Sequence, residues 1–302
     1  MPDPFLITIV GPTAIGKTAL GIKLAQHFDT EILSADSRQF FKEMKIGTAV
    51  PEEEELQAAP HHFIQHISVE EEYSVGDFER DAIAKLEELF QRKKVVVMVG
   101  GSGLYVKSIL EGLDYFPEVD PQIRADLNNE SLENLQRKLA NFDPDYYQKV
   151  DAENPHRLIR ALEICIGTGK TYSSFLNRKK EPRNFRSIQI GLTAEREKIY
   201  ERINLRVDKM METGLPEEAK KLFPKRHLNA LNTVGYKELF LHLEGKISEE
   251  EAVAEIKKNT RRFAKRQLTW FKKDTAIAWF KNTTPPEEII AYAEKQIKDS
   301  SQ

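Results

Sequence analysis

The fold of this chain is decided by Gly11-Pro12-Thr13-Ala14-Ile15-Gly16-Lys17-Thr18, which matches the phosphate-binding pattern G-x-x-x-x-G-K-[ST]. The apolar run 5–10 before it predicts a buried strand, and the helical spacing of apolar residues after it predicts a helix. Between a strand and a helix, such a loop wraps a phosphate with backbone N–H groups, and the helix dipole adds partial positive charge. Lys17 adds a point charge and Thr18 a hydroxyl suited to Mg²⁺. The sequence therefore predicts a site for a di- or triphosphate.

Strands and helices alternate on both sides of this loop. The runs 31–35 and 95–99 predict strands, and Ser74-x-x-Asp77 resembles a capping box. It opens a helix whose apolar face carries Val75, Phe78, Ala82, Leu86, Leu89 and Phe90. We expect an α/β fold, a P-loop NTPase-like parallel sheet flanked by helices. The first part of the core would span 1–114, and a mainly helical insertion domain would span 115–185. The third part, 186–302, would hold a return strand (187–192) and the C-terminal helices.

Composition excludes several classes of protein. The 302 residues are 40% hydrophobic and 31% charged, no apolar run approaches the length of a membrane span, and the N-terminus lacks signal-peptide features. The single cysteine, Cys165, lies in an apolar run that predicts a packed thiol and fits a reducing cytoplasm. Net charge is −3, so any nucleic-acid site must be local. We expect a cytoplasmic protein with no membrane partner.

A carboxylate follows the second predicted strand, on the same edge of the sheet as the P-loop. The strand 95–99 runs into glycines and Ser102, instead of the Asp or Glu with which NTPases help to hold Mg²⁺. Asp36 is either a turn or N-cap residue, or a group that carries a proton or holds a metal. We favour a functional role. A carboxylate beside bound phosphates is repelled by them, and such an unfavourable position is expected only for a group that takes part in the function.

Basic residues gather in the second half of the chain. Arg202 and Arg206 share one face of a predicted helix, where Arg206 either reaches a bound diphosphate or lies in solvent. A basic run at 156–160 is followed by Arg178, Lys179, Lys180, Arg183 and Arg186. The helix predicted at 257–273 is also strongly basic, and its other face carries Ile256, Phe263, Leu268 and Phe271. Such a helix is either a solvated surface helix or part of a polyanion groove, and two basic zones in a slightly acidic protein favour the groove.

Together these residues resemble the tRNA dimethylallyltransferase family, also called the tRNA isopentenyltransferases. The resemblance runs from Gly11 to about Trp279. After the P-loop its motifs are Asp-Ser-x-Gln at 36–39, Ile-Gly-Thr-Ala at 46–49, Ala-Pro-His-His at 59–62, Gly-Gly-Ser-Gly-Leu-Tyr at 100–105, Asn-Pro-His-Arg-Leu-Ile-Arg-Ala-Leu-Glu at 154–163, Thr-Val-Gly-Tyr-Lys-Glu at 233–238 and Lys-Arg-Gln-Leu-Thr-Trp-Phe at 265–271.

The resemblance implies an enzyme that transfers a dimethylallyl group from dimethylallyl diphosphate to N6 of the adenosine 3′ of the anticodon in tRNA, releasing diphosphate. By matched position Asp36 would be the general base, Ser102 would lie in the catalytic site where many members have Thr, and Mg²⁺ would bind Thr18. The diphosphate would lie against Gly11, Pro12, Thr13, Ala14, Ile15, Gly16, Lys17, Thr18 and Arg206. The contacts with the tRNA anticodon stem-loop would come from Asp36, Ser37, Arg38, Gln39, Arg124, His156, Arg157, Leu158, Ile159, Arg160, Gly235, Tyr236, Lys237, Lys265, Arg266, Gln267 and Trp270. We expect a monomer that needs no protein partner.

Three alternatives share part of this pattern. A nucleotide or small-molecule kinase would have the P-loop and the core, but the missing acidic residue after strand 95–99 argues against it. An adenylate prenyltransferase acting on free AMP would share Asp36, but it needs no basic helix at 257–273. A non-catalytic RNA-binding P-loop protein would not need Asp36 beside the phosphate loop.

Overall fold

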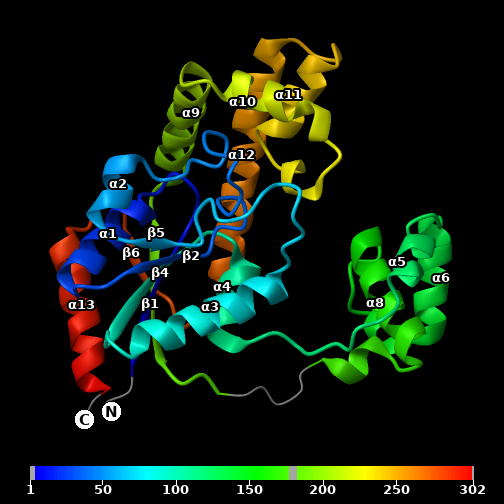
Figure 1. Ribbon diagram of the computed structural model, residues 1–302, viewed down its shortest axis with the longest axis horizontal. Helices are drawn as coiled ribbons and strands as arrows, with labels where there is room; N and C mark the ends of the chain where they lie inside the picture. Colours follow the sequence, from blue (N-terminus) through cyan, green and yellow to red (C-terminus); the bar gives the residue numbers. More distant parts are fainter. Residues whose placement is uncertain (1–3, 177–181, 301–302) are drawn as a thin grey trace. The chain divides into compact units, whose positions relative to one another are not determined.

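The computed structural model describes residues 4–176 and 182–300, which fall into two compact units (Figure 1). The larger unit joins Met1–Leu110 to Arg183–Gln302, and the smaller is Glu111–Pro182. Among the described residues, no helix is long and apolar enough to cross a membrane.

The larger unit is built on a parallel sheet with the strand order β3-β2-β4-β1-β5-β6. Its strands are β1 (Phe5–Val10), β2 (Ile32–Ser34), β3 (His61–His62), β4 (Val95–Val99), β5 (Arg186–Thr193) and β6 (Ala278–Lys281). The four strands predicted from the sequence, and the parallel α/β fold, are confirmed. The edge strands β3 and β6 escaped prediction because two and four residues are too few to show a period.

Helices cover both faces of the sheet because the inner strands are apolar on both sides. Along β1, Leu6 and Val10 face one apolar cluster while Ile7 and Ile9 face another. Helices α3 (Val75–Phe90) and α4 (Gly103–Glu111) belong to the first cluster, and α1 (Lys17–His27) and α13 (Pro286–Asp299) to the second (Figure 1). The predicted capping box is confirmed, since Asp77 N donates to Ser74 Oγ (3.2 Å) and Ser74 N donates to the Asp77 carboxylate (3.0 Å).

Helices α9 to α12 pack against one another and carry much of the site (Figure 1). Their bounds are Arg196–Glu212, Leu215–Leu222, Tyr236–Leu243 and Glu249–Phe271, with 3₁₀ turns at Phe223–Lys225 and Asn229–Leu231. The remaining helix of this unit, α2 (Glu53–Ala58), lies between β2 and β3 in the chain. On the apolar face of α12, Ile256 and Phe271 are buried, whereas Phe263 is 37% exposed. Phe263 is left exposed because this turn of the helix borders a cavity.

The smaller unit is helical in all its described elements. These are α5 (Pro121–Leu127), α6 (Leu132–Phe142), α7 (Pro144–Tyr147), α8 (Pro155–Thr168) and a 3₁₀ turn, Tyr172–Phe175. Helix α8 packs against α5 and α6, and its Cys165 is a fully buried free thiol, as predicted. Arg178, Lys179 and Lys180 of the predicted basic zone lie outside the described residues.

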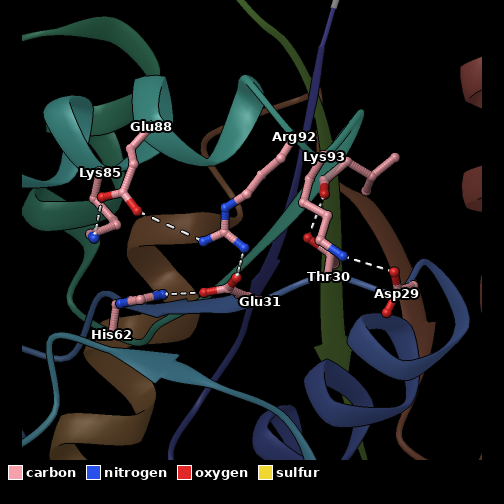
Figure 2. Close-up of polar contacts among 9 residues, drawn as sticks. Asp29, Thr30, Glu31, His62, Lys85, Glu88, Arg92 and Lys93 are labelled. Atoms are coloured by element: carbon pink, nitrogen blue, oxygen red, sulfur yellow. Dashed lines mark hydrogen bonds and ion pairs between the residues drawn. The ribbon is translucent and has the colours of Figure 1, made fainter.

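Polar contacts tie together the sheet edge at which β2 and β4 begin (Figure 2). Glu31, just before β2, binds His62 through Nε2 (2.7 Å) and Arg92 through a guanidinium N–H (2.5 Å). Burial by itself would raise the pKa of Glu31, but these two hydrogen bonds outweigh it and lower the pKa. Lys93, just before β4, pairs with Asp29 (2.8 Å). Ion pairs therefore occupy the end of the sheet at which the strands begin. The site lies at the opposite end, beyond the carboxyl ends of the strands.

Candidate active site

The P-loop joins the end of β1 to the start of α1 and has the backbone that its glycines predict. Gly11 has φ 144°, and a Cβ there would stand 2.6 Å from the carbonyl oxygen of Leu192 on β5. Gly16, with φ 108°, lies just before the first residue of α1. Inside the loop, Lys17 Nζ donates to the Pro12 carbonyl oxygen (2.9 Å). The loop is thus a closed cradle at the end of the central strand.

Two adjoining cavities open beside this loop, both lined by the larger unit alone. One has a volume of about 520 Å³ and the other about 80 Å³. Lys17 and Thr18 line only the smaller cavity, whereas apolar groups such as Val234, Phe263 and Trp270 line only the larger one. Five residues line both: Thr13, Asp36, Thr48, Gly101 and Arg206. The two cavities therefore meet at four polar side chains and one glycine.

Two half-buried cations, Lys17 and Arg206, interact with the Asp36 carboxylate beside this junction. Burial lowers the pKa of Lys17 to about 8, against the raising effect of Asp36, and Arg206 lowers it further. Helix α9 brings two arginines to the P-loop: Arg206 donates to Thr13 Oγ1 (3.1 Å) and Arg202 to the Ala14 carbonyl (2.7 Å). Arg206 therefore does not lie in solvent. Positive charge held away from water in this way suits a polyanion.

Asp36 lies directly beyond β2 and has one carboxylate oxygen left for a ligand. Its Oδ1 accepts a hydrogen bond from the backbone N–H of Arg38 (3.1 Å), which fixes the turn. Oδ2 has no hydrogen-bond partner in the described part of the chain. The next residue, Ser37, donates its N–H to Ser102 Oγ (3.1 Å). Asp36 is therefore both a turn residue and a carboxylate that faces the two cavities.

Several residues predicted to contact tRNA hold the walls of the cavities. Arg38 donates to the carbonyls of Asn229 (3.1 Å) and Ala230 (2.9 Å). The amide of Gln39 donates to the carbonyls of Thr48 and Ala49, at 3.2 and 2.9 Å. These side chains fix two loops that line the site. Direct contact of Arg38 and Gln39 with tRNA stays a prediction.

Gln267 and Tyr236 are also committed to bonds within the protein. Gln267, 6% exposed, accepts from the Thr13 N–H (2.8 Å) and donates to the Gly101 carbonyl (2.9 Å). Tyr236 is fully buried, and its hydroxyl donates to Glu218 (2.6 Å). The prediction that the Tyr236 side chain contacts tRNA is corrected, because it has no exposed surface.

An exposed rim surrounds the larger cavity. Leu104 and Trp270 line this cavity and are 47% and 45% exposed. The exposed cations Lys237 and Arg266 also line it, and Lys265 next to Arg266 is exposed as well. The Trp270 ring lies so close to the Gly103 backbone that a Cβ there would stand 2.3 Å from it. Gly103, like Gly101 beside Gln267, therefore lets α12 approach this loop closely. An exposed aromatic ring among cations is a surface suited to nucleobases and phosphates.

In the smaller unit, Glu163 organises the predicted tRNA-binding arginines. Its carboxylate, 4% exposed, pairs with Arg124 and Arg160. Burial would raise the pKa of Glu163, but hydrogen bonds from the two arginines lower it. His156 and Arg157 are exposed at the start of α8, as binding requires. Leu158 and Ile159 are buried in the core of this unit, so the prediction that their side chains contact tRNA is corrected.

Two residues that line the site were missed by reasoning from chemistry. Thr48 and His61 belong to sequence tags, Ile-Gly-Thr-Ala and Ala-Pro-His-His, that carried no chemical signal of their own. They lie on loops and a short edge strand whose position depends on tertiary contacts. The two tags themselves were the sequence signal from which Thr48 and His61 could have been identified as site residues.

Comparison with known proteins agrees with this arrangement. Residues 39–274 match the family model described as IPP transferase. The tRNA dimethylallyltransferase of Christiangramia forsetii is 65% identical over 97% of this chain and 98% of its own, and that of Flavobacterium johnsoniae is 58% identical over 98% and 99%. A crystal structure of the tRNA isopentenylpyrophosphate transferase from Bacillus halodurans superposes with a TM-score of 0.76 at 36% identity, covering 99% of this chain and 98% of that one. A eukaryotic dimethylallyltransferase, solved acting on tRNA, gives a TM-score of 0.85 at 26% identity, covering 98% and 80%.

Proposed function

The chain belongs to the IPP transferase family, and on that premise we propose that it transfers a dimethylallyl group from dimethylallyl diphosphate to N6 of the adenosine 3′ of the anticodon in tRNA. One observation carries the proposal: a P-loop cavity and a larger, partly apolar cavity meet at Asp36 and Arg206. A donor on one side and a base on the other would react at that junction.

The donor's diphosphate belongs in the smaller cavity. Lys17 and Thr18 line only this cavity, and Arg206 reaches it from α9. The dimethylallyl group would then extend past the shared residues into the larger cavity, where apolar side chains lie. Because the cradle recognises a diphosphate and no nucleoside is needed, the P-loop does not imply ATP.

The residues at the P-loop fit a magnesium ion held largely by the donor. The Thr18 hydroxyl lines the smaller cavity and has no hydrogen-bond partner among the described residues. Those residues also contain no group of three or more His, Cys, Asp or Glu that could hold a metal. Mg²⁺ is often bound by few protein groups together with phosphate oxygens and water. When bound, it would neutralise charge that develops on the leaving diphosphate.

The protein's own groups would act on both partners of the reaction. Lys17 and Arg206 would stabilise the diphosphate as the bond between C1 and oxygen breaks, and the oxygen keeps the electron pair. The exocyclic amine of adenine is a weak nucleophile, because its lone pair is conjugated with the ring. Asp36 would accept its proton while the N6–C1 bond forms. Ser102 would hold the turn that aims Asp36, through the Ser37 N–H.

The acceptor must be an exposed base, since adenine inside a stacked loop cannot enter a cavity. The larger cavity has a rim with Trp270 and Arg266 that suits an unstacked base and its phosphates. The remaining predicted contacts, among them Lys265, Arg124, His156 and Arg157, would hold the rest of the anticodon stem-loop.

The test is a transfer assay with the purified protein and labelled dimethylallyl diphosphate, Mg²⁺ and either unmodified tRNA or AMP. We expect label in tRNA, equally with and without ATP, and a digest that contains N6-dimethylallyladenosine from the position 3′ of the anticodon. Label in AMP would instead identify an adenylate prenyltransferase. A strict ATP requirement, with ADP or AMP formed in proportion to product, would identify a kinase-like reaction.

A further inference from the structure

His61 and His62, the two residues of β3, have different surroundings. Consecutive side chains of a strand point to opposite faces. His62 binds Glu31 through Nε2 at 2.7 Å, within the ion-pair cluster of Figure 2. His61 lines the smaller cavity together with Lys17, Thr18 and Arg206. Only the first histidine is therefore placed to act on a bound diphosphate.

The two ring nitrogens of His61 are not equivalent. Nδ1 lies 2.8 Å from the carbonyl oxygen of Ala59, which can only accept, so Nδ1 carries the proton. Nε2 is buried and has no hydrogen-bond partner in the described chain. Burial lowers the pKa of His61, in spite of the Ala59 hydrogen bond and Glu55, which raise it. The ring is neutral at neutral pH, and Nε2 holds a lone pair.

An unpaired lone pair in this position restricts what can bind beside it. A buried acceptor without a partner is unfavourable, so the bound state should supply a donor. An ionised diphosphate has only acceptor oxygens and cannot supply one. A magnesium ion that keeps part of its water shell brings O–H donors into the same cavity.

We propose that His61 is a positioning residue of the donor site, whose Nε2 accepts a hydrogen bond from a water molecule carried into the smaller cavity by the Mg²⁺–diphosphate complex. This inference rests on the proposed function, because it takes the smaller cavity as the diphosphate site. The buried Nε2 of His61 thereby has a hydrogen-bond partner in the bound state, and the Ala-Pro-His-His segment has a role in holding the donor. His61 makes no bond to the reacting atoms and orients the hydrated leaving group.

The experiment measures binding of inorganic diphosphate by calorimetry, with Mg²⁺ and with EDTA. His61→Phe keeps a ring but removes both nitrogens, and His61→Gln restores an acceptor near the place of Nε2. Both variants lose the imidazole bond to Ala59, so the loss of that bond does not account for a difference between them, and the restored acceptor does. His62→Gln is the matched control on the other face of the strand. His61→Met replaces His61→Phe should the larger ring impair folding, which circular dichroism would reveal.

In the presence of Mg²⁺, loss of one hydrogen bond should weaken binding by His61→Phe about 3- to 10-fold. His61→Gln and His62→Gln should stay within about twofold of the wild-type protein, and with EDTA all four proteins should bind alike, since a metal-bound water is then missing. Wild-type affinity in His61→Phe with Mg²⁺, an equal loss with EDTA, or a wild-type protein that does not bind diphosphate would overturn the inference. A wild-type protein that binds Mg²⁺–diphosphate but transfers no label to tRNA would overturn the proposed function and leave the role of His61 standing.

Discussion

The backbone N–H of Thr13 donates a 2.8 Å hydrogen bond to Oε1 of Gln267, a residue 254 positions further along the chain. The same Gln267 side chain donates to the carbonyl of Gly101 in the loop after β4. One amide of α12 thus fixes both the P-loop and the glycine loop opposite it. The backbone of the P-loop is therefore held in part by α12, a helix far from it in sequence.

Replacing Gln267 with Ala should impair use of the donor without changing the affinity for tRNA. The substitution leaves the Thr13 N–H and the Gly101 carbonyl unpaired, and buried unpaired groups are costly, so kcat/KM for dimethylallyl diphosphate should fall at least about 10-fold. Steady-state kinetics and a tRNA filter-binding assay measure the two effects. Thr269→Ala, on the same helix but exposed, is the control. A loss of tRNA affinity with normal donor kinetics would return Gln267 to the predicted role of an RNA contact.

Asp36→Asn should nearly abolish transfer while tRNA remains bound. The amide retains the oxygen that accepts from the Arg38 N–H, but it cannot accept the proton from N6. Loss of a positioned general base reduces the rate by about 10²- to 10⁴-fold. Single-turnover kinetics measure this step. Asp274→Asn is the matched control, because Asp274 Oδ1 accepts from Ala276 N in a similar turn (2.9 Å). Near-normal turnover in Asp36→Asn would make Asp36 a structural cap.

The sequence predicted those parts of the site that follow from local pattern. The strand at 5–10, the P-loop and the turn at Asp36 depend on neighbours in the chain, and the structure has them as expected. Gln267 and Tyr236 were expected to meet tRNA, yet their partners are Thr13 and Glu218, far away in sequence. Spacing along a helix tells which residues share a face, but not which distant loop that face meets. The same limit applies to Phe263, which shares the apolar face of α12 with Ile256 and Phe271 but is exposed while they are buried.

Neutralising the exposed cations of α12 should weaken tRNA binding and reduce its salt dependence. The variant replaces Arg262, Lys265 and Arg266 with Gln; all three are exposed. Each lost phosphate contact lowers the slope of log K against log salt by about one unit. The control replaces Lys23, Lys295 and Lys298, which are exposed on α1 and α13. Filter binding over a salt series gives both slopes, and an unchanged slope in the α12 variant would make this helix an ordinary solvated surface.

His66 should make the fold less stable below about pH 6.5. Both of its nitrogens are buried without partners among the residues described, beside Phe40 and Tyr73, and burial lowers its pKa. As the pH falls, the unfolded chain therefore takes up the proton before the folded protein does. The free energy of unfolding is highest above about pH 6.5 and decreases as the pH falls toward the lower pKa of the folded state. Urea unfolding at pH 7.5 and 5.5 should show a smaller difference in His66→Phe than in the wild-type protein. His61, whose pKa is lowered in the same direction, would account for a remaining difference.

Lys17 should set the upper pH limit for use of the donor. Burial lowers its pKa to about 8 in the free protein, so the ammonium is charged below that pH and becomes neutral as the pH rises through it. A neutral Lys17 would neither attract the diphosphate nor stabilise it as a leaving group, and kcat/KM for dimethylallyl diphosphate should therefore fall above about pH 8.

Lys17→Arg keeps its charge throughout this range, because a guanidinium titrates far higher. Its activity should be lower at pH 7 for reasons of geometry, yet its profile should stay flat to about pH 9.5, whereas Lys17→Ala should be poor at every pH. Rates measured from pH 7 to 9.5 at saturating tRNA decide the matter: a flat profile in the wild-type protein, or the same fall in Lys17→Arg, would assign the titration to another group.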